Sequence, residues 1–257
     1  MLSHRIRHVP YVWRQQLGYV ADFCPICREP RAFRLSSKRL IPQSYYIPVG
    51  IGEFVGNERR CLDCGVDLHG DPSRYAALAR QGGSFGALKK LTYPGFDEAQ
   101  RGRLELEKAV RKDPFGIDAR DRQLLIRQPL ELLSRRVEAR VGAMQPDRDV
   151  AVTFVAAWVV AWAGMALAGR FVPESAEVVT LALLAMAVVA VAVQLALVNR
   201  RHMHRHVTPL LVRCLAPLKP GRDELEAAVA DMKAARHRIG KALSVDHLMR
   251  RLDAARG

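Results

Sequence analysis

Two long apolar segments in the second half of the chain constrain its fold more than any other feature. Residues 150–169 and 178–198 contain no charged side chain, and Gln194 is the one strongly polar residue of the second segment. A helix that rises 1.5 Å per residue needs about 20 apolar residues to cross a bilayer core of about 30 Å. Both segments are long enough, so we expect two membrane-spanning helices.

The residues between the two segments predict how these helices are connected. Residues 170–177 form a short polar stretch, and Pro173 within it stops the first helix. A connection this short joins antiparallel helices, so residues 149–199 should form a transmembrane helical hairpin. The alternative is a buried helical hairpin inside a soluble protein.

The charge distribution predicts the orientation of the hairpin. The chain carries 40 Lys and Arg against 26 Asp and Glu, and the net charge is +9 over residues 1–148, −2 over 149–198 and +7 over 199–257. Cytoplasmic flanks of membrane spans collect Lys and Arg. The flanking arginines are Arg135, Arg136, Arg140 and Arg148 before the hairpin and Arg200, Arg201 and Arg205 after it. We therefore expect both termini on the cytoplasmic side of an inner membrane, with the bilayer as a partner. The first eight residues lack the apolar core of a signal peptide.

Two Cys-x-x-Cys pairs in the N-terminal part carry the clearest chemistry. Cys24 and Cys27 form the first pair, Cys61 and Cys64 form the second, and 33 residues separate them. Each pair places two sulfur atoms on one side of a tight turn, and zinc prefers four such ligands at tetrahedral angles. The spacing therefore predicts one structural zinc ion bound by these four cysteines.

Other uses of four cysteines remain open from the sequence. Disulfides are disfavoured if the segment is cytoplasmic, and a redox pair would need a neighbouring βαβ pattern that is not visible. An iron–sulfur cluster also uses four cysteines. His69 could replace one sulfur ligand, although we expect it on the surface. Four thiolates leave no open position for water, so we expect no catalytic residues here and no enzyme.

The segment around the two pairs resembles a zinc ribbon. The resemblance covers about Asp22 to Gly70, with strands expected at 31–35, 43–48 and 52–55 between the cysteine turns. It implies a small β fold held by metal. Zinc ribbons occur in transcription factors, ribosomal proteins, enzymes and protein adaptors, so the resemblance is specific for metal binding and unspecific for function.

The remainder of the chain predicts helices on both sides of the hairpin. Their apolar residues recur at helical spacing, which is typical of amphipathic helices that pack on one face. The expected helices are 97–113, 118–141, 222–243 and 245–255. The chain thus divides into an N-terminal segment with the ribbon (1–70), a cytoplasmic helical region (71–148), the hairpin (149–199) and C-terminal cytoplasmic helices (200–257). The two cytoplasmic parts should pack together, with the fifth cysteine, Cys214, as a small buried residue.

Two functions fit these features. The first is a membrane-anchored cytoplasmic zinc-ribbon protein that serves as a protein-interaction or assembly module. The alternative is a membrane-tethered nucleic-acid-binding protein, for which basic and aromatic residues near the first cysteine pair would supply phosphate contacts and stacking. These residues are Arg28, Arg31, Arg34, Lys38 and Arg39 with Phe33, Tyr45 and Tyr46. No Gly-rich phosphate loop points to a small-molecule substrate. The alternating His202, His204 and His206 fit either metal binding or a position near lipid phosphate.

Overall fold

The computed structural model of this chain describes residues 11–44, 47–143, 148–171 and 176–255. The first eight residues, which we assessed for a targeting signal, lie outside the described residues. So do Tyr45 and Tyr46 and the centre of the turn between the two apolar segments.

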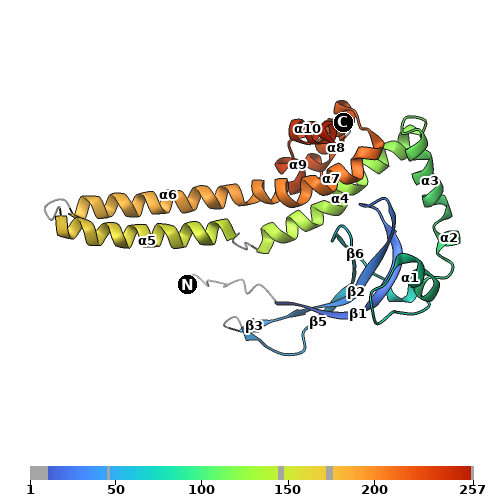
Figure 1. Cartoon of the computed structure of the whole chain (residues 1–257), viewed down its shortest axis with the longest axis horizontal. Coiled ribbons are helices and arrows are strands. Elements are labelled where there is room, and N and C mark those ends of the chain that lie inside the picture. The colour runs from blue at the N-terminus through green and yellow to red at the C-terminus, as the bar shows by residue number, and fades with distance from the viewer. Residues whose placement is uncertain (1–10, 45–46, 144–147, 172–175, 256–257) are drawn as a thin grey trace, which may run out of the picture.

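An antiparallel sheet of four strands forms the N-terminal part. The strands are β1 (Tyr11–Cys24), β2 (Glu29–Ile41), β5 (Glu53–Cys61) and β6 (Asp67–His69), and they lie in the order β1-β2-β5-β6. A separate short ribbon pairs β3 (Gln43–Ser44) with β4 (Ile47–Pro48). The cysteine turns thus lie at one end of the sheet, and β3 and β4 lie toward the other (Figure 1).

Strand β1 extends the sheet well beyond the segment that resembles a zinc ribbon. It begins at Tyr11 rather than near Asp22, and it pairs with β2 along its whole length except for a register shift between Gln16 and Gly18. Gly18 lies against the chain that crosses it, because a Cβ atom there would be 2.8 Å from the Ala79 carbonyl oxygen. The absence of a side chain at this position permits the bridge between Tyr19 and Ala79.

Four helices follow the sheet before the apolar segments. They are α1 (Phe85–Thr92), α2 (Phe96–Ala99), α3 (Arg101–Lys112) and α4 (Ala119–Ala143). The first of these was not expected from the sequence. The expected helix 97–113 is divided into α2 and α3, and the expected helix 118–141 corresponds to α4.

The C-terminal region forms four helices: α7 (Thr208–Leu215), α8 (Arg222–Ala234), α9 (Arg238–Ala242) and α10 (Val245–Ala254). The single helix expected over 222–243 is broken, because Arg236 adopts a left-handed φ of 59°. The chain then doubles back so tightly that a Cβ atom on Gly240 would lie 2.7 Å from the backbone nitrogen of Lys233. Only glycine fits that close approach.

One continuous core joins the parts of the chain before and after the apolar segments, as expected from the sequence. Helix α4 packs against α7, α8 and α9, and we call α4 with α7–α10 the helical base. The core also includes cysteines and apolar residues from the end of the sheet that carries the cysteine turns. Its fully buried members include Ile26, Phe33, Ile126, Leu130, Leu133, Leu211, Leu215 and Leu225.

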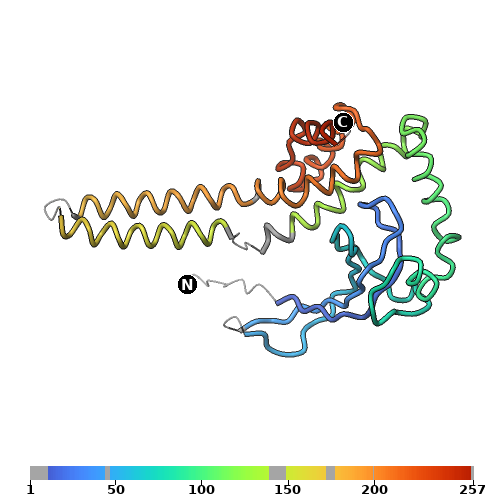
Figure 2. The backbone as a smooth tube through the Cα atoms, in the orientation of Figure 1, coloured from blue at the N-terminus to red at the C-terminus, as the bar shows by residue number. Residues whose placement is uncertain are grey.

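The two apolar segments form a long antiparallel helix pair that projects from the helical base (Figures 1 and 2). They are α5 (Arg148–Phe171) and α6 (Ala176–His202), and both are long and apolar enough to cross a membrane. The most apolar stretches are only 11% and 0% buried, which is opposite to what a hairpin inside a soluble core requires. Gly164 packs directly on Leu183 where the helices meet.

Candidate metal centre

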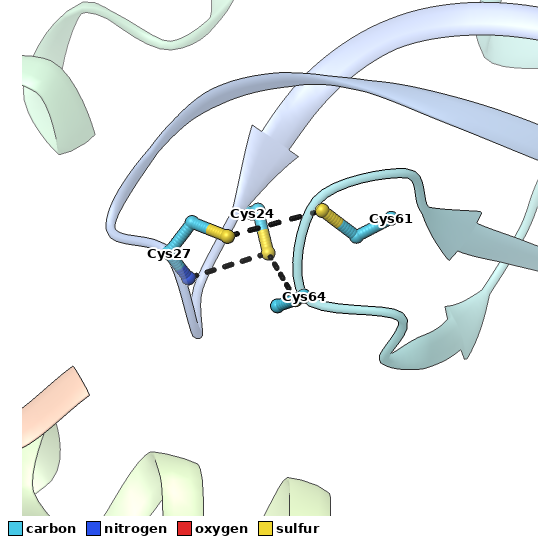
Figure 3. A group of neighbouring side chains, drawn as sticks. All are labelled: Cys24, Cys27, Cys61 and Cys64. Carbon is cyan, nitrogen blue, oxygen red and sulfur yellow. Dashed lines mark hydrogen bonds between the residues drawn. The ribbon is translucent and has the colours of Figure 1, made fainter. Parts of the chain in front are cut away.

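The four cysteines are delivered by two turns at the same end of the sheet. Cys24 ends β1 and Cys27 lies in the turn to β2, whereas Cys61 ends β5 and Cys64 lies in the turn to β6. Figure 3 shows the two turns facing each other with the side chains converging between them. Strands β2 and β5 pair with Phe33 opposite Cys61, and this register brings the turns together.

The sulfur positions match a tetrahedral metal site. The four sulfur atoms lie within 4.8 Å of one another, with 3.6 Å between Cys24 Sγ and Cys64 Sγ and 3.9 Å between Cys27 Sγ and Cys61 Sγ. A zinc–sulfur bond of about 2.3 Å places tetrahedral ligands about 3.8 Å apart. A disulfide needs about 2.05 Å, and all four cysteines are free. The arrangement is compatible with a zinc ribbon and could hold a metal ion.

Each turn is closed by a residue with positive φ after its second cysteine. In the second turn this residue is Gly65 (φ 67°), whose backbone N–H donates to the Cys61 carbonyl over 3.0 Å. In the first turn it is Arg28 (φ 57°), and the Cys27 N–H points at Cys24 Sγ over 3.4 Å. A backbone N–H aimed at sulfur stabilises the thiolate, which is the form that binds metal.

The buried thiols share their protons unequally. Hydrogen bonds with Cys24 and Cys27 lower the pKa of the Cys61 thiol, whereas the corresponding bonds to Cys27 and Cys61 raise the pKa of Cys24. The four thiols therefore compete for protons when they lie this close together. A divalent cation would remove this competition, because its charge favours the thiolate at every ligand.

Two arginines supply positive charge beside the cysteines. Asp63, between Cys61 and Cys64, lies 2.6 Å from Arg213 and 3.0 Å from Arg31. The hydrogen bond from Arg213 lowers the pKa of Asp63, so this carboxylate is charged at neutral pH. Four thiolates around a divalent cation carry a net charge of −2 and the Asp63 carboxylate adds −1, so the two guanidinium groups offset part of this negative charge.

Helix α7 contacts both cysteine turns, and we call these contacts the joint. Arg213 of α7 binds Asp63 of the second turn, and the adjacent Cys214 donates its thiol hydrogen to the Pro25 carbonyl of the first turn over 3.4 Å. Cys214 is 1% exposed, as expected, and burial raises the pKa of its thiol to about 12. Ile26 of the first turn is fully buried in the shared core.

Helix α3 holds the first turn from another direction. Arg28 and Glu107 form an ion pair at 2.7 Å with both side chains about 5% exposed or less, and Arg103 approaches the same carboxylate at 3.0 Å. Breaking a buried pair of this kind leaves an uncompensated charge and costs about 3–5 kcal/mol. The first cysteine turn is therefore held by both α3 and α7.

The other residues considered for metal binding lie apart from this cluster. His69 is exposed on β6, consistent with a surface position. The three alternating histidines separate into two ring contacts, His202 with His206 and His204 with His247. Within the described ranges, the four cysteines are the one group of three or more His, Cys, Asp or Glu side chains placed to share an ion.

Several of the residues considered for nucleic-acid binding are buried or paired with acidic side chains. Phe33 is fully buried and offers no face for stacking. Arg28 is buried against Glu107, and Arg31 is paired with Glu29 and Asp63. The basic surface near the first turn is thus smaller than its sequence indicates.

A polar cluster next to the site was not predicted from the sequence. Asp22 is 1% exposed, and it accepts a hydrogen bond from the Tyr75 hydroxyl over 2.7 Å and pairs with Arg59. Burial raises the pKa of the Tyr75 hydroxyl, so it stays a donor. The only sequence signal was an aspartate inside an apolar strand two residues before Cys24. The cluster fixes the start of the first cysteine turn to the segment after β6.

Comparisons with protein-family models, with curated proteins and with solved structures find no match to this chain. The chemistry of the site therefore rests on its own geometry. That geometry is a closed set of four sulfur ligands at the contact between the sheet and the helical base.

Proposed function

We propose that this protein is anchored in the cytoplasmic membrane by α5 and α6, with both termini in the cytoplasm, and that a structural zinc ion fixes its sheet to the anchor. The fixed sheet would act as a protein-interaction or assembly module. The two apolar helices, the basic flanks and the four clustered cysteines support this proposal.

The joint is the observation that carries the proposal. From Glu177 to Leu218 the chain follows one continuous helical path, so α7 is the direct extension of a proposed membrane span. The same α7 binds both cysteine turns through Arg213 and Cys214. A metal that rigidifies the turns would therefore rigidify the connection between sheet and membrane.

Zinc suits this role because it has no redox chemistry and favours four sulfur ligands. Cys24, Cys27, Cys61 and Cys64 would hold the ion, and the closed shell would supply folding free energy rather than a reaction centre. The exposed apolar surface of α5 and α6 would lie in lipid, with Asp149, Arg201 and Arg205 paired at the cytoplasmic boundary.

Purification and fractionation test the proposal directly. The full chain should remain in the membrane pellet after alkaline carbonate extraction and should contain about one zinc ion per chain, as for other four-cysteine structural sites. A reporter that fluoresces only in the cytoplasm should be active at either terminus. Recovery in the soluble fraction, or zinc well below half an equivalent, would contradict it.

The assembly role needs a test of its own. Partners cross-linked to the full chain in membranes should be retained by a Cys214→Ser variant, which keeps all four ligands, and lost with Cys61→Ser, which removes one. A partner retained equally by both variants would bind independently of the metal-held sheet. Nucleic acid recovered in the same cross-linked material would favour the alternative function if its recovery falls when the salt concentration is raised before cross-linking.

A further inference from the structure

The end of the sheet that lies far from the cysteines carries an exposed apolar surface. We call it the distal patch. Its side chains are 40–82% exposed, from Trp13 at the low end to Ile51 at the high end. The patch consists of Tyr11, Trp13, Ile47, Val49, Ile51 and Phe54. Apolar side chains gathered at one exposed end of a soluble element usually mark a contact surface.

The direction of the sheet shows what this surface faces. In Figure 1 the distal ends of β1 and β5, with β3 and β4, extend in the same direction as α5 and α6. The ribbon of β3 and β4 reaches about the level along the long axis at which α5 begins, and β1 begins somewhat short of that level. If the hairpin crosses a bilayer, the bilayer surface lies at that level.

The composition of the patch matches the boundary between lipid headgroups and acyl chains. Trp13 pairs with Arg39 across β1 and β2, and Arg39 pairs with Phe54 across β2 and β5, so one arginine lies between two aromatic side chains on one sheet face. Trp and Tyr concentrate at membrane interfaces, and arginine extends its charge from an apolar surface toward phosphate.

The charge near the patch favours anionic lipid. Arg14, Lys38 and Arg39 lie on this end of the sheet, and Arg14 pairs with Glu58, which leaves Lys38 and Arg39 against Glu53. A basic element with exposed aromatic and aliphatic residues binds anionic bilayers through both contributions. We infer that the distal patch inserts into the headgroup region of the same leaflet at which the hairpin enters. This inference rests on the proposed membrane anchor.

If so, the sheet is held at both ends. The joint fixes its cysteine end to the helical base, and the distal patch fixes its other end to the bilayer. The sheet would then present its remaining surface to the cytoplasm in one orientation.

Trp13 provides a direct test. The chain has three tryptophans, and Trp158→Phe with Trp162→Phe leaves Trp13 as the only indole. This variant would be reconstituted in vesicles of phosphatidylcholine and phosphatidylglycerol that contain lipids brominated near the headgroup. We expect Trp13 fluorescence to be quenched by the brominated lipid and protected from acrylamide.

Matched substitutions separate docking from general effects. Ile47→Glu with Ile51→Glu should abolish most of the quenching, because both side chains are exposed in the fold and the new charges oppose insertion. Leu124→Glu makes the same change at an exposed site on α4 and should leave the quenching unchanged. Equal quenching in all three proteins would overturn the inference.

Three further outcomes also test the inference. Trp13 that is quenched by acrylamide and not by brominated lipid, in a chain that resists carbonate extraction, would overturn the docking and leave the anchor intact. Protection from both quenchers would overturn the docking and assign the patch to a contact with a second copy of the chain. Removal of the chain by carbonate would overturn the anchor and the docking together.

Discussion

At the scale of single residues, Cys61 tests the metal site most directly. It is 1% exposed and lies 3.9 Å from Cys27 Sγ. Structural zinc contributes about 10–16 kcal/mol to the folding of small four-ligand domains, which is comparable to the whole stability of a typical domain. We expect Cys61→Ser to lose the bound zinc and to lower the melting temperature of the sheet, measured by elemental analysis and thermal unfolding in detergent.

The fifth cysteine is the control for that substitution. Cys214→Ser keeps a hydroxyl that can donate to the Pro25 carbonyl in place of the thiol. It should retain a full equivalent of zinc and change the free energy of unfolding by no more than about 1–2 kcal/mol. Zinc loss in this variant would mean that Cys214, rather than the four clustered cysteines, determines binding.

Glu224 gives a pH-dependent prediction within the helical base. It accepts two hydrogen bonds from Arg122 of α4, at 2.6 and 2.9 Å, which lower the pKa of its carboxyl. Because the folded-state pKa is depressed, the stabilisation is complete above the unfolded pKa of about 4.3 and is lost as pH falls through the folded value. Glu224→Gln should cost about 0.5–1 kcal/mol at neutral pH, since the glutamate is 36% exposed.

Denaturant unfolding at several pH values measures this difference. The gap in unfolding free energy between the native chain and Glu224→Gln should be largest near neutral pH and should close below about pH 4. Glu226→Gln, at a more exposed pair with Arg222, is the matched control and should show a smaller gap. A gap that widens in acid would contradict the assigned role of Arg122.

At the scale of elements, the break between α8 and α9 depends on a single glycine. A Cβ atom on Gly240 would lie 2.7 Å from the Lys233 nitrogen and 2.9 Å from the Met232 carbonyl carbon, so the backbone must move. We expect Gly240→Ala to destabilise the helical base by about 1–3 kcal/mol, measured by denaturant unfolding.

We expect substitution of Gly102 to change the stability in the direction opposite to substitution of Gly240. Gly102 lies inside α3 with open space around its Cβ position. Gly102→Ala should stabilise the protein by about 0.5–1 kcal/mol, because alanine is the better helix former. If both substitutions changed the stability in the same direction, close packing at Gly240 would not be the cause.

The sequence predicts some elements well because their information is local. Helices α5 and α6 follow from uncharged runs, and α4 from apolar spacing, both of which are readable in one window of sequence. Strand β1 was not among the strands expected from the sequence, and Gln15 and Gln16 interrupt its alternation at the register shift. The break in the helix at Arg236 could not be predicted from a local pattern either, because it depends on how closely Gly240 approaches α8.

The candidate site likewise has one part that the local sequence predicts and another part that it does not. The approach of the four cysteines was predictable, because Cys-x-x-Cys spacing builds a ligand pair within one turn. The pairing of Asp63 with Arg213 and the contact between Pro25 and Cys214 were not, because each joins residues at least 150 positions apart. Such contacts depend on the packing of whole segments, which no local pattern records.

At the scale of the whole molecule, the joint predicts that metal controls access to Cys214. With the metal bound, this buried thiol should resist alkylation, because Pro25 covers it and its high pKa leaves little thiolate. After chelation in detergent, we expect Cys214 to be alkylated with the four ligand cysteines while the helical content of α5 and α6 persists. Peptide mass spectrometry identifies the modified residue.

Restored zinc is the control for this experiment. Adding it back before alkylation should protect Cys214 again. If chelation exposes the four ligand cysteines and leaves Cys214 protected, the sheet stays docked without metal, and the joint would be held by packing of Ile26 and its neighbours alone.

The contact between Pro25 and Cys214 also sets an order of events during biosynthesis. The two residues are 189 positions apart, and both apolar helices lie between them in the chain. The cysteine turns leave the ribosome long before α7 exists, so the sheet lacks its docking surface while α5 and α6 are synthesised. Completion of the joint therefore requires that both helices have been made and that α7 has returned to the sheet, and under the proposed membrane anchor a misinserted hairpin would leave the cysteine turns undocked.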